Sequence, residues 1–345
     1  MLTTELVERV LSAIPTRTVG VLGDLFLDRY LDIDPTRDEP SVETGKVAYQ
    51  VTRVRSYPGA AGTVINNLSA LGVGRIYPIA LIGDDGEGYE LRQALQATRG
   101  VEPGGVQPYP GRRTPTYTKP MYGTEELNRL DIKNRTPTPD AGQDTILDLL
   151  EEAWPQFDAL IVLDQVSEVE CGVVTKRVRD RLAELAERDA DKFVLADSRE
   201  QIGLFRNVCV KPNLTEAAAS FENDVGEGYA VRSSHGGFAM HLQEKCGRVV
   251  FLTNSGDGII LQGPKETEME LWNIPAYPVS GPIDICGAGD SCSAGITSAM
   301  VSGLTHEQAA AFGNLVASIT IQQIGMTGTA TPGQVRQRWR EVGGG

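Results

Sequence analysis

An α/β fold built on a mainly parallel sheet is the fold class that the sequence predicts. Short apolar runs rich in β-branched residues alternate with amphipathic stretches along most of the chain. Strands that are buried on both faces read as continuous apolar runs, and parallel strands need helical crossovers between them. The 345 residues, 41% hydrophobic and 23% charged, suffice to bury the core of one large domain or of two smaller ones.

The expected elements follow in order along the chain. An amphipathic N-terminal stretch precedes the first apolar run, and small residues at helical spacing, SAGITSAMVSG, predict a tightly packed helix near the C-terminus. Helices are also predicted within 64–72, 88–100 and 174–190. The predicted buried strands are 18–23, 76–83, 159–164, 193–197, 207–213 and 248–254.

Polar residues stand at the ends of these strands. In open α/β sheets ligands bind at the carboxyl ends of the strands, so the polar ends predict one shared crevice. The alternative is that aspartate and asparagine only cap the helices that follow. The residues concerned are Asp24, Asp84, Asp164, Asp197, Asn213 and Asn254.

Two segments interrupt the α/β pattern. Residues 46–57 and 114–122 alternate in the manner of exposed strands and carry no helix signal. They predict a small β-sheet beside the crevice, which we call the lid, and residues 134–144 then return the chain to the core.

Composition excludes several classes of function. A net charge of −14 and a pI near 4.8 disfavour a nucleic-acid or anionic-membrane partner. The five cysteines form no CxxC pair and no metal-ligand cluster with the three histidines, as expected for reduced thiols. The acidic amphipathic N-terminus does not resemble a signal peptide, and the apolar runs are too short to cross a bilayer. We therefore expect a soluble, cytoplasmic protein.

A glycine-rich turn near the C-terminus carries the strongest chemical signal. Gly287, Ala288 and Gly289 open a predicted helix and are followed at once by Asp290. Bare backbone N–H groups and the helix dipole make such a turn a seat for an anion. An aspartate beside an anion seat is electrostatically unfavourable unless the acid has a chemical function there.

A second pair of polar residues, Asn213 and Glu216, follows a predicted strand. A carboxylate at the mouth of the crevice can hold Mg²⁺ through water. The structural alternative is a helix start in which Asn213 and Glu216 form a capping box. No Walker A run occurs, and no GxGxxG follows the first strand, so a P-loop enzyme and a dinucleotide-dependent dehydrogenase are both disfavoured.

Six motifs in fixed order together resemble the ribokinase-like (PfkB) family of carbohydrate kinases over almost the whole chain. They are GDLFLDRY (23–30), PGAAGTVINNLSALG (58–72), LIGDDGEG (81–88), KPNLTE (211–216), TNSGDG (253–258) and DICGAGD (284–290). The resemblance implies a three-layer α/β/α sandwich with a mainly parallel central sheet and a small β lid. It implies a kinase domain over 1–335 with lid segments near 30–57 and 112–133, and a C-terminal tail over 336–345.

The resemblance also implies an ATP-dependent phosphotransferase that uses Mg²⁺, with room for a monovalent cation such as K⁺. Asp290 is then the base that takes the proton of the acceptor hydroxyl, and the amides of Gly287, Ala288 and Gly289 form the anion hole. Glu216 would hold magnesium through water. The expected nucleotide-binding residues are Lys211, Asn213, Glu216, Thr253, Gly256 and Gly258, with TGTATP (327–332) closing the adenine site.

For the acceptor sugar the resemblance points to Asp24, Asp28, Gly59, Thr63 and Arg129. A sugar that already carries phosphate would need basic partners, and we expect these on or near the lid. Asp28 with Arg29 could instead be a surface ion pair, and a solvated lid face explains the basic residues equally well. The basic candidates are Lys119, Arg129, Lys133 and Arg135.

Within the family the motifs look most like bacterial heptose-7-phosphate kinases, but the sugar-facing positions depart from the pattern. Gly59-Ala60 and Thr63 stand where the family has a Gly-Gly pair followed by an asparagine. Ile285-Cys286 and Cys292 replace the usual signature residues, and Asp164 alone remains of a motif typical of heptose kinases. The acceptor is therefore expected to be heptose 7-phosphate, or else ribose, fructose or a nucleoside. A non-catalytic sugar- or nucleotide-binding regulator on the same fold is a further alternative.

The lid also predicts a homodimer. Val47, Tyr49 and Val51 alternate along one face of an expected strand and need cover, because a small sheet with a bare apolar face is marginal in water. Lids of this family often pair with the lid of a second subunit. The alternative is a monomer whose lid folds back on its own crevice.

Overall fold

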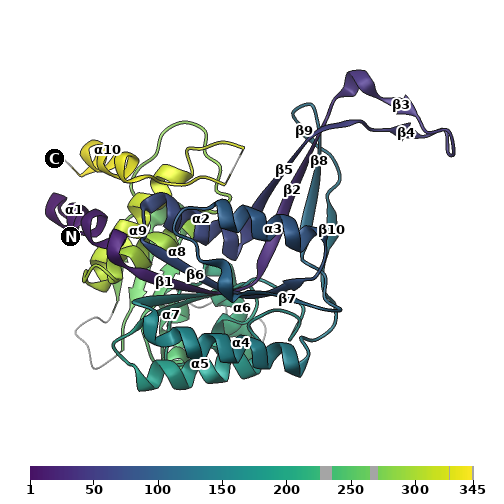
Figure 1. Cartoon of the computed structure of the whole chain (residues 1–345). Coiled ribbons are helices and arrows are strands. Elements are labelled where there is room, and N and C mark those ends of the chain that lie inside the picture. Colours follow the sequence, from purple (N-terminus) through teal and green to yellow (C-terminus); the bar gives the residue numbers. More distant parts are fainter. Residues whose placement is uncertain (226–234, 265–270, 326, 344–345) are drawn as a thin grey trace.

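The computed structural model describes residues 1–225, 235–264, 271–325 and 327–343. Figure 1 shows a central sheet between two layers of helices, with a second sheet projecting from one end. The predicted three-layer α/β/α architecture with a β lid is confirmed.

The central sheet has the order β16-β15-β14-β13-β12-β11-β1-β6-β7 in the described part of the chain. Strands β7 to β14 in this order are parallel, and β15 and β16 add an antiparallel edge. All six residues of β1 are buried, which explains why Thr18 is its one polar residue. The strands are β1 (Thr18–Gly23), β6 (Arg75–Gly83), β7 (Val106–Tyr109), β11 (Ala159–Asp164), β12 (Phe193–Ser198), β13 (Cys209–Val210), β14 (Val250–Thr253), β15 (Ile259–Gln262) and β16 (Trp272–Ile274).

Two helical layers cover the sheet (Figure 1). One face carries α1 (Thr4–Ala13), α2 (Ala61–Leu71), α3 (Gly86–Ala97), α8 (Ala288–Met300), α9 (His306–Thr320) and α10 (Pro332–Val342). The other carries α4 (Asp140–Ala153), α5 (Lys176–Arg188), α6 (Leu214–Val225) and α7 (His235–Cys246). Helix α8 is buried along its length because its small residues let α9 approach closely, with Gly295 against Gly313. This packing fixes the position of the turn that precedes α8.

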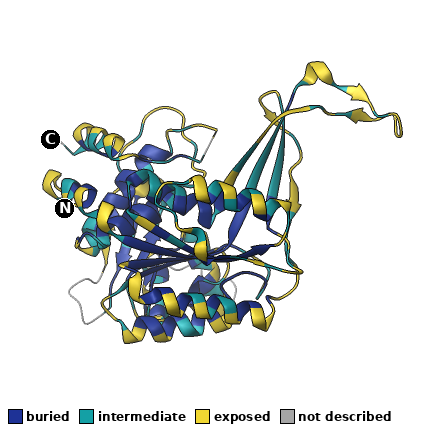
Figure 2. Cartoon of the chain, viewed as in Figure 1, coloured by how far each residue is buried: buried dark blue, intermediate teal, exposed yellow. Residues whose placement is uncertain are grey.

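The lid is a mixed sheet of order β10-β8-β2-β5, with β9 beside β8, and a two-stranded arm continues from it. Figure 2 shows that the arm is mainly exposed, the lid strands are largely half-buried, and the central sheet is buried. The strand expected over 46–57 is interrupted, so Val47 lies in the arm and Val51 in the lid sheet. The strands are β2 (Leu25–Ile33), β5 (Val51–Ala60), β8 (Thr116–Tyr122), β9 (Glu125–Glu126) and β10 (Leu130–Ile132), with β3 (Glu39–Pro40) and β4 (Val47–Ala48) in the arm.

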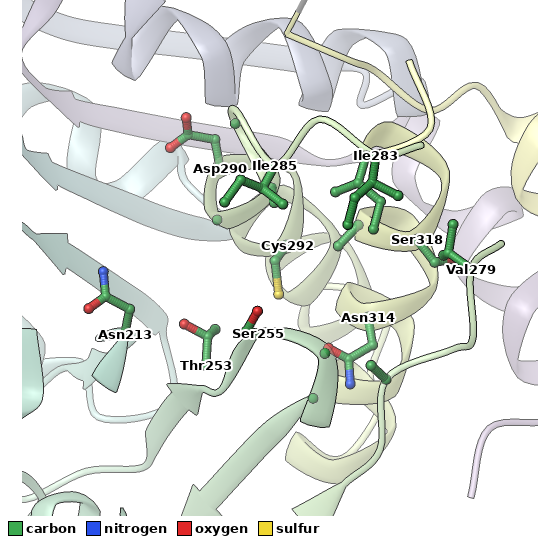
Figure 3. Close-up of a pocket in the computed structure, with 18 of the residues that line it drawn as sticks. Asn213, Thr253, Ser255, Val279, Ile283, Ile285, Asp290, Cys292, Asn314 and Ser318 are labelled. Atoms are coloured by element: carbon green, nitrogen blue, oxygen red, sulfur yellow. The ribbon is translucent and has the colours of Figure 1, made fainter. Parts of the chain in front are cut away.

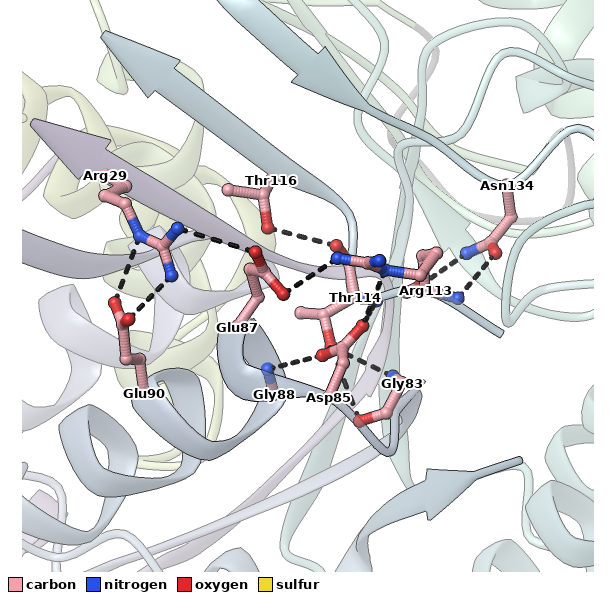
Figure 4. Close-up of polar contacts among 10 residues, drawn as sticks. All are labelled: Arg29, Gly83, Asp85, Glu87, Gly88, Glu90, Arg113, Thr114, Thr116 and Asn134. Atoms are coloured by element: carbon pink, nitrogen blue, oxygen red, sulfur yellow. Dashed lines mark hydrogen bonds and ion pairs between the residues drawn. The ribbon is translucent and has the colours of Figure 1, made fainter. Parts of the chain in front are cut away.

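A polar network fastens the lid to the core (Figure 4). Arg29 of β2 contacts Glu90 of α3, with 2.6 Å between Nη2 and Oε1, and it reaches Glu87 at 3.5 Å. Arg113, just before β8, pairs with Asp85 at 3.0 Å and with Glu87 at 2.9 Å. The motif LIGDDGEG therefore joins both lid connections to the first turn of α3.

The C-terminal boundary differs from the expectation. Residues 336–342, expected as a tail, continue helix α10, whose Trp339 is 7% exposed and whose Arg336 pairs with Glu8. Residues 344–345 lie outside the described part. In that part no helix combines the length and apolar character needed to span a bilayer. All five cysteines are free thiols.

Candidate active site

A cleft of about 750 Å³ lies at the carboxyl ends of the parallel strands. Figure 3 shows Asp290 and Ile285 on the α8 side of this cleft, with Asn213 and Thr253 on the opposite side at the strand ends. The cleft gathers most of the residues predicted for catalysis and nucleotide binding. They are Lys211, Asn213, Glu216, Thr253, Gly256, Gly258, Gly287, Ala288, Gly289 and Asp290.

The turn before α8 requires its first glycine. Gly287 has φ = 76°, and a Cβ there would lie 2.4 Å from Cγ2 of Thr327. Helix α8 begins at Ala288, and the first N–H groups of a helix have no partner within it. The N–H of Ala288, however, donates to the carbonyl of Ile285 at 3.1 Å. Of the three amides expected to form the anion hole, that of Ala288 is therefore turned back to the preceding loop.

Asp290 lies half-buried in the first turn of α8. Burial, and then the nearby Asp197 carboxylate, raise the pKa of Asp290 to about 7, against the opposing effect of Lys211 and Arg199. A carboxyl group poised near neutrality suits a general base. The site therefore has a carboxyl group with a pKa near neutrality in the first turn of α8.

Lys211 has a partner inside the site. Its Nζ lies 2.8 Å from Oδ2 of Asp197, and the lysine residue is 3% exposed. Burial alone would lower the pKa of Lys211, but Asp197 raises it overall. Lys211 and Asp197 thus form a buried ion pair.

Asn213 and Glu216 form the capping box that the sequence allowed. The Asn213 N–H donates to Oε2 of Glu216 at 2.8 Å, and the Glu216 N–H donates to Oδ1 of Asn213 at 2.9 Å. Both side chains also line the cleft, so capping and ligand binding are compatible here. Burial and the neighbouring Asp197 raise the pKa of Glu216 to about 7.

These carboxylates suit a divalent cation held at a distance. Glu216 and Asp197 lie close in a partly desolvated site, where a cation relieves their repulsion. In the described part of the chain no three His, Cys, Asp or Glu side chains converge as a metal site. The residues therefore fit Mg²⁺ that keeps its waters and phosphate ligands, rather than a protein cage.

The rest of the cleft is partly apolar. Ile283 and Ile285 are 51% and 69% exposed at its rim, which is unusual for large aliphatic side chains on a surface. Opposite them Gly258 has φ = 100°, and a Cβ there would lie 2.1 Å from the carbonyl oxygen of Ile274. Asn314 donates to the carbonyls of Ile274 and Pro275, each at 3.1 Å. This part of the cleft can accept a flat, mostly apolar ring.

A smaller cavity of about 90 Å³ lies between the lid and α2. Asp28 and Thr63 line it, and Nζ of Lys119 lies 3.6 Å from Oδ1 of Asp28. A Cβ on Gly59 would lie 2.5 Å from Oδ2 of Asp28, so the glycine leaves room for this carboxylate in its present position. Gly287 lies beside Thr63, and the cavity therefore adjoins the turn before α8.

Three predicted acceptor-side residues lie elsewhere. Asp24 is 4% exposed and accepts backbone N–H groups from Gln165, Val166 and Val173, so its carboxylate holds a loop instead of facing the cavity. Arg129 makes a bidentate contact with Asp131, and Lys133 reaches Glu168 at 3.7 Å.

Asp28 and Arg29 do not pair with each other. They have separate partners, Lys119 for the aspartate and the α3 carboxylates for the arginine. Among the basic residues considered for a sugar phosphate, Lys119 lies nearest the cavity.

Ala60 marks a strained departure from the expected Gly-Gly pair. Its backbone has φ = 52° and ψ = −117°, a conformation that favours glycine, and it directly precedes α2. Thr63 in the first turn of α2 lines the acceptor cavity where an asparagine was expected. The turn before α2 therefore has a backbone conformation typical of glycine although alanine occupies it.

Arg199 and Gln165, which both line the cleft, were not predicted from the sequence. Nε of Arg199 donates to Oε1 of Gln165 at 2.8 Å. The only available signal was position, because each residue follows the last residue of a buried strand, Asp164 or Ser198.

The fold is shared with solved ribokinases. The ribokinase from Cryptococcus neoformans var. grubii in complex with ADP aligns with a TM-score of 0.66 at 16% identity, covering 94% of this chain and 100% of that one. The Arabidopsis thaliana ribokinase complexed with ribose and ATP has a TM-score of 0.63 at 15% identity, covering 93% and 98%. The predicted ribokinase-like fold is thereby confirmed.

Sequence relatives are closer. The bifunctional protein HldE of Trichlorobacter lovleyi is 27% identical over 336 residues, and that of Caulobacter vibrioides is 28% identical over 311 residues. They cover 96% and 90% of this chain, which spans only 64% and 61% of their length. Residues 25–332 match the pfkB family of carbohydrate kinases. This match takes in most of the chain, including the cleft and the lid, and the chain therefore belongs to the pfkB carbohydrate kinase family.

Proposed function

We propose that the protein transfers the γ-phosphoryl group of ATP to a hydroxyl of a sugar or sugar phosphate. The observation that carries this proposal is Asp290, with a pKa near 7, at the N-terminus of α8 and across the cleft from Asn213, in a cleft that Glu216 also lines. Solved relatives with ADP or with ribose and ATP support the donor and the class of acceptor. ATP as donor and the five free thiols agree with the cytoplasm as the expected compartment.

The mechanism follows from the placement of these residues. An acceptor hydroxyl in the smaller cavity lies near Thr63 and Gly287, beside the turn that leads to Asp290. Asp290 takes the hydroxyl proton while the oxygen forms a bond to the γ-phosphorus. The bond from that phosphorus to the bridging oxygen breaks, and ADP leaves with the electron pair. Backbone N–H groups at the start of α8 offset the negative charge of the transferred group.

Magnesium would be held through water by Glu216, and it would neutralise charge on the phosphates. The chain's own contribution is to fix Glu216, whose Oε2 is bound by the Asn213 N–H. The ring of the nucleotide would lie between Ile283, Ile285 and the backbone near Gly258.

For the acceptor we propose heptose 7-phosphate first, on the motifs that resemble heptose-7-phosphate kinases. Lys119 beside Asp28 would receive its existing phosphate, and Asp28 would accept hydrogen bonds from hydroxyls. Thr63 stands where the family has an asparagine that contacts the sugar. Ribose, fructose and nucleosides are therefore the alternative acceptors.

An ADP-release screen with Mg-ATP across sugars, sugar phosphates and nucleosides tests the proposal. Turnover with heptose 7-phosphate well above that with unphosphorylated sugars is the expected result. Turnover with another acceptor would overturn the heptose assignment only. Nucleotide binding without turnover on any acceptor would instead support a regulator.

Glu216→Gln is expected to raise the Mg²⁺ concentration for half-maximal turnover about 10–100-fold, because it removes the charge that orients the hydrated ion. Titrating Mg²⁺ at fixed ATP measures this shift. Glu222→Gln, on the same helix, is the control. A loss of stability with superimposable Mg²⁺ curves would mean that Glu216 serves only as a helix cap.

We further propose that the lid forms the interface of a homodimer. Val47, Tyr49, Val51 and Val54 are 57%, 49%, 43% and 53% exposed on the lid and its arm, an unusual density of apolar surface. Tyr49, between β4 and β5, packs edge-on against Tyr122 at the end of β8, with the ring centres 5.5 Å apart. The two rings lie where the arm joins the lid sheet.

Light scattering at micromolar concentration is expected to give twice the 37.2 kDa chain mass, and Tyr49→Asp is expected to halve it. Leu204→Asp is the control, since Leu204 is 54% exposed between β12 and β13, in a turn that lies outside the lid. A wild-type mass near that of one chain would refute the dimer.

A further inference from the structure

Arg199 is a cation in the cleft that the mechanism above leaves without a function. It follows β12 directly, and its backbone N–H donates to the carbonyl of Asp164 at 3.2 Å. The side chain lines the same cleft as Asp290 and Glu216. In a protein with a net charge of −14, a basic side chain that lines a ligand-binding cleft is a candidate for contact with an anionic ligand.

The charge of Arg199 acts on both sides of the cleft. It opposes the rise in the pKa of Asp290 on one side and of Glu216 on the other. The guanidinium therefore lies within electrostatic reach of the proposed base and of the proposed magnesium carboxylate. The group being transferred has to pass between those two residues.

Arg199 is also the cation in the cleft that remains available. Lys211 is buried and bound to Asp197 at 2.8 Å, whereas Arg199 is exposed and has no ion pair within the described ranges of the chain. Its one direct side-chain contact there is the neutral Gln165, which fixes Nε at 2.8 Å and leaves both Nη groups to donate elsewhere. A guanidinium held in this way presents a planar fork suited to phosphate oxygens.

Gln165 in turn is fixed from the other side. Its backbone N–H donates to Oδ2 of the buried Asp24 at 2.9 Å, which holds the loop after β11 in place. Asp24 thus sets the position of Gln165, and Gln165 sets the direction of Arg199. The hydrogen bonds that keep the Asp24 carboxylate away from the lid cavity therefore also fix the orientation of Arg199.

We propose that Arg199 is a catalytic residue that donates to the oxygens of the phosphoryl group in transfer, with Gln165 as its positioning residue. This inference rests on the proposed kinase function. Charge accumulates on those oxygens as the γ-phosphorus moves from the bridging oxygen of ATP to the acceptor oxygen, so a fixed guanidinium stabilises the transition state more than the bound ATP.

The test compares Arg199→Met, Arg199→Lys and Gln165→Ala with the wild type and with Arg206→Met. Arg206 is an exposed arginine paired with Asp180 outside the cleft, and it serves as the matched control. Calorimetry measures the affinity for Mg-AMPPNP, which mimics bound ATP, and for Mg-ADP with aluminium fluoride, which mimics the group in transfer. Turnover is measured with the best acceptor of the ADP-release screen.

Arg199→Met is expected to lower kcat about 10²–10³-fold and to weaken aluminium fluoride binding in proportion, with Mg-AMPPNP affinity within about threefold of wild type. Arg199→Lys should recover part of the loss, and Gln165→Ala should lower kcat about 10-fold without changing KM for ATP. Thermal melting shows whether each variant is folded.

Two results would overturn the assignment of Arg199: an unchanged kcat, or equal losses for AMPPNP and for the aluminium fluoride complex. A folded wild type that binds no Mg-AMPPNP would contradict the kinase function itself, which keeps the two failures apart.

Discussion

Asp290→Asn is expected to lower kcat about 10²–10⁴-fold while leaving the affinity for Mg-AMPPNP nearly unchanged. The substitution keeps the shape of the side chain but removes the group that takes the acceptor proton. Steady-state kinetics and calorimetry check the two parts, with Asp191→Asn, exposed before β12, as the control. A variant that keeps half of the wild-type turnover would exclude Asp290 as the base.

The pKa of Asp290 adds a second readout. Burial raises this pKa from an ordinary value of 3.8 to about 7, so folding favours the neutral carboxyl group. The stability that the neutral form provides is therefore lost as the pH rises from about 4 to about 7. Asparagine stays neutral, and Asp290→Asn should raise the melting temperature relative to wild type by more at pH 8 than at pH 4. A variant that is both inactive and more stable cannot be explained by misfolding.

Lys211→Met is expected to lower the free energy of unfolding by about 3–5 kcal/mol, because it leaves Asp197 buried without its cation. Urea denaturation measures the loss. Lys176→Met is the control, since the side chain of Lys176 is 74% exposed and its pair with Asp180 is a surface one.

The double variant Lys211→Met with Asp197→Asn separates a lost pair from lost packing. Removing both charges leaves no uncompensated ion, so the double variant should be more stable than Lys211→Met alone. A double variant that loses the sum of two large single effects would mean that the buried pair has no special energetic role.

The central sheet could be predicted because its signals are local. Strands such as 159–164 are buried on both faces, so the apolar run itself marks them. The antiparallel edge β15–β16 was not predicted because its strands have only four and three residues. The lid strand β2 was not predicted because three buried residues are followed by five half-buried ones, so that burial does not alternate along it. The arm around Val47 could not be separated from β5 for the same reason.

The site residues that could be predicted are those that lie close together in the sequence. The turn before α8 and the Asn213–Glu216 pair each lie within a few residues, so the sequence displays them directly. Arg199 and Gln165 meet only because β11 and β12 run side by side, with Asp164 opposite Ser198. Asp24 and Asp28 looked equivalent in the sequence, but one faces the loop after β11 and the other the lid cavity.

The strand order of the central sheet also determines the sequence of events during synthesis. Strand β1 pairs with β6 on one side and with β11 on the other, where Val19 lies opposite Ala159. The second partner leaves the ribosome about 140 residues after β1, a delay of roughly 7–28 s at 5–20 residues per second. Through that interval one edge of a strand that is wholly buried in the folded protein stays unpaired, which is the condition under which strands associate between molecules. Chaperone dependence should therefore be greatest for nascent chains that end between β6 and β11.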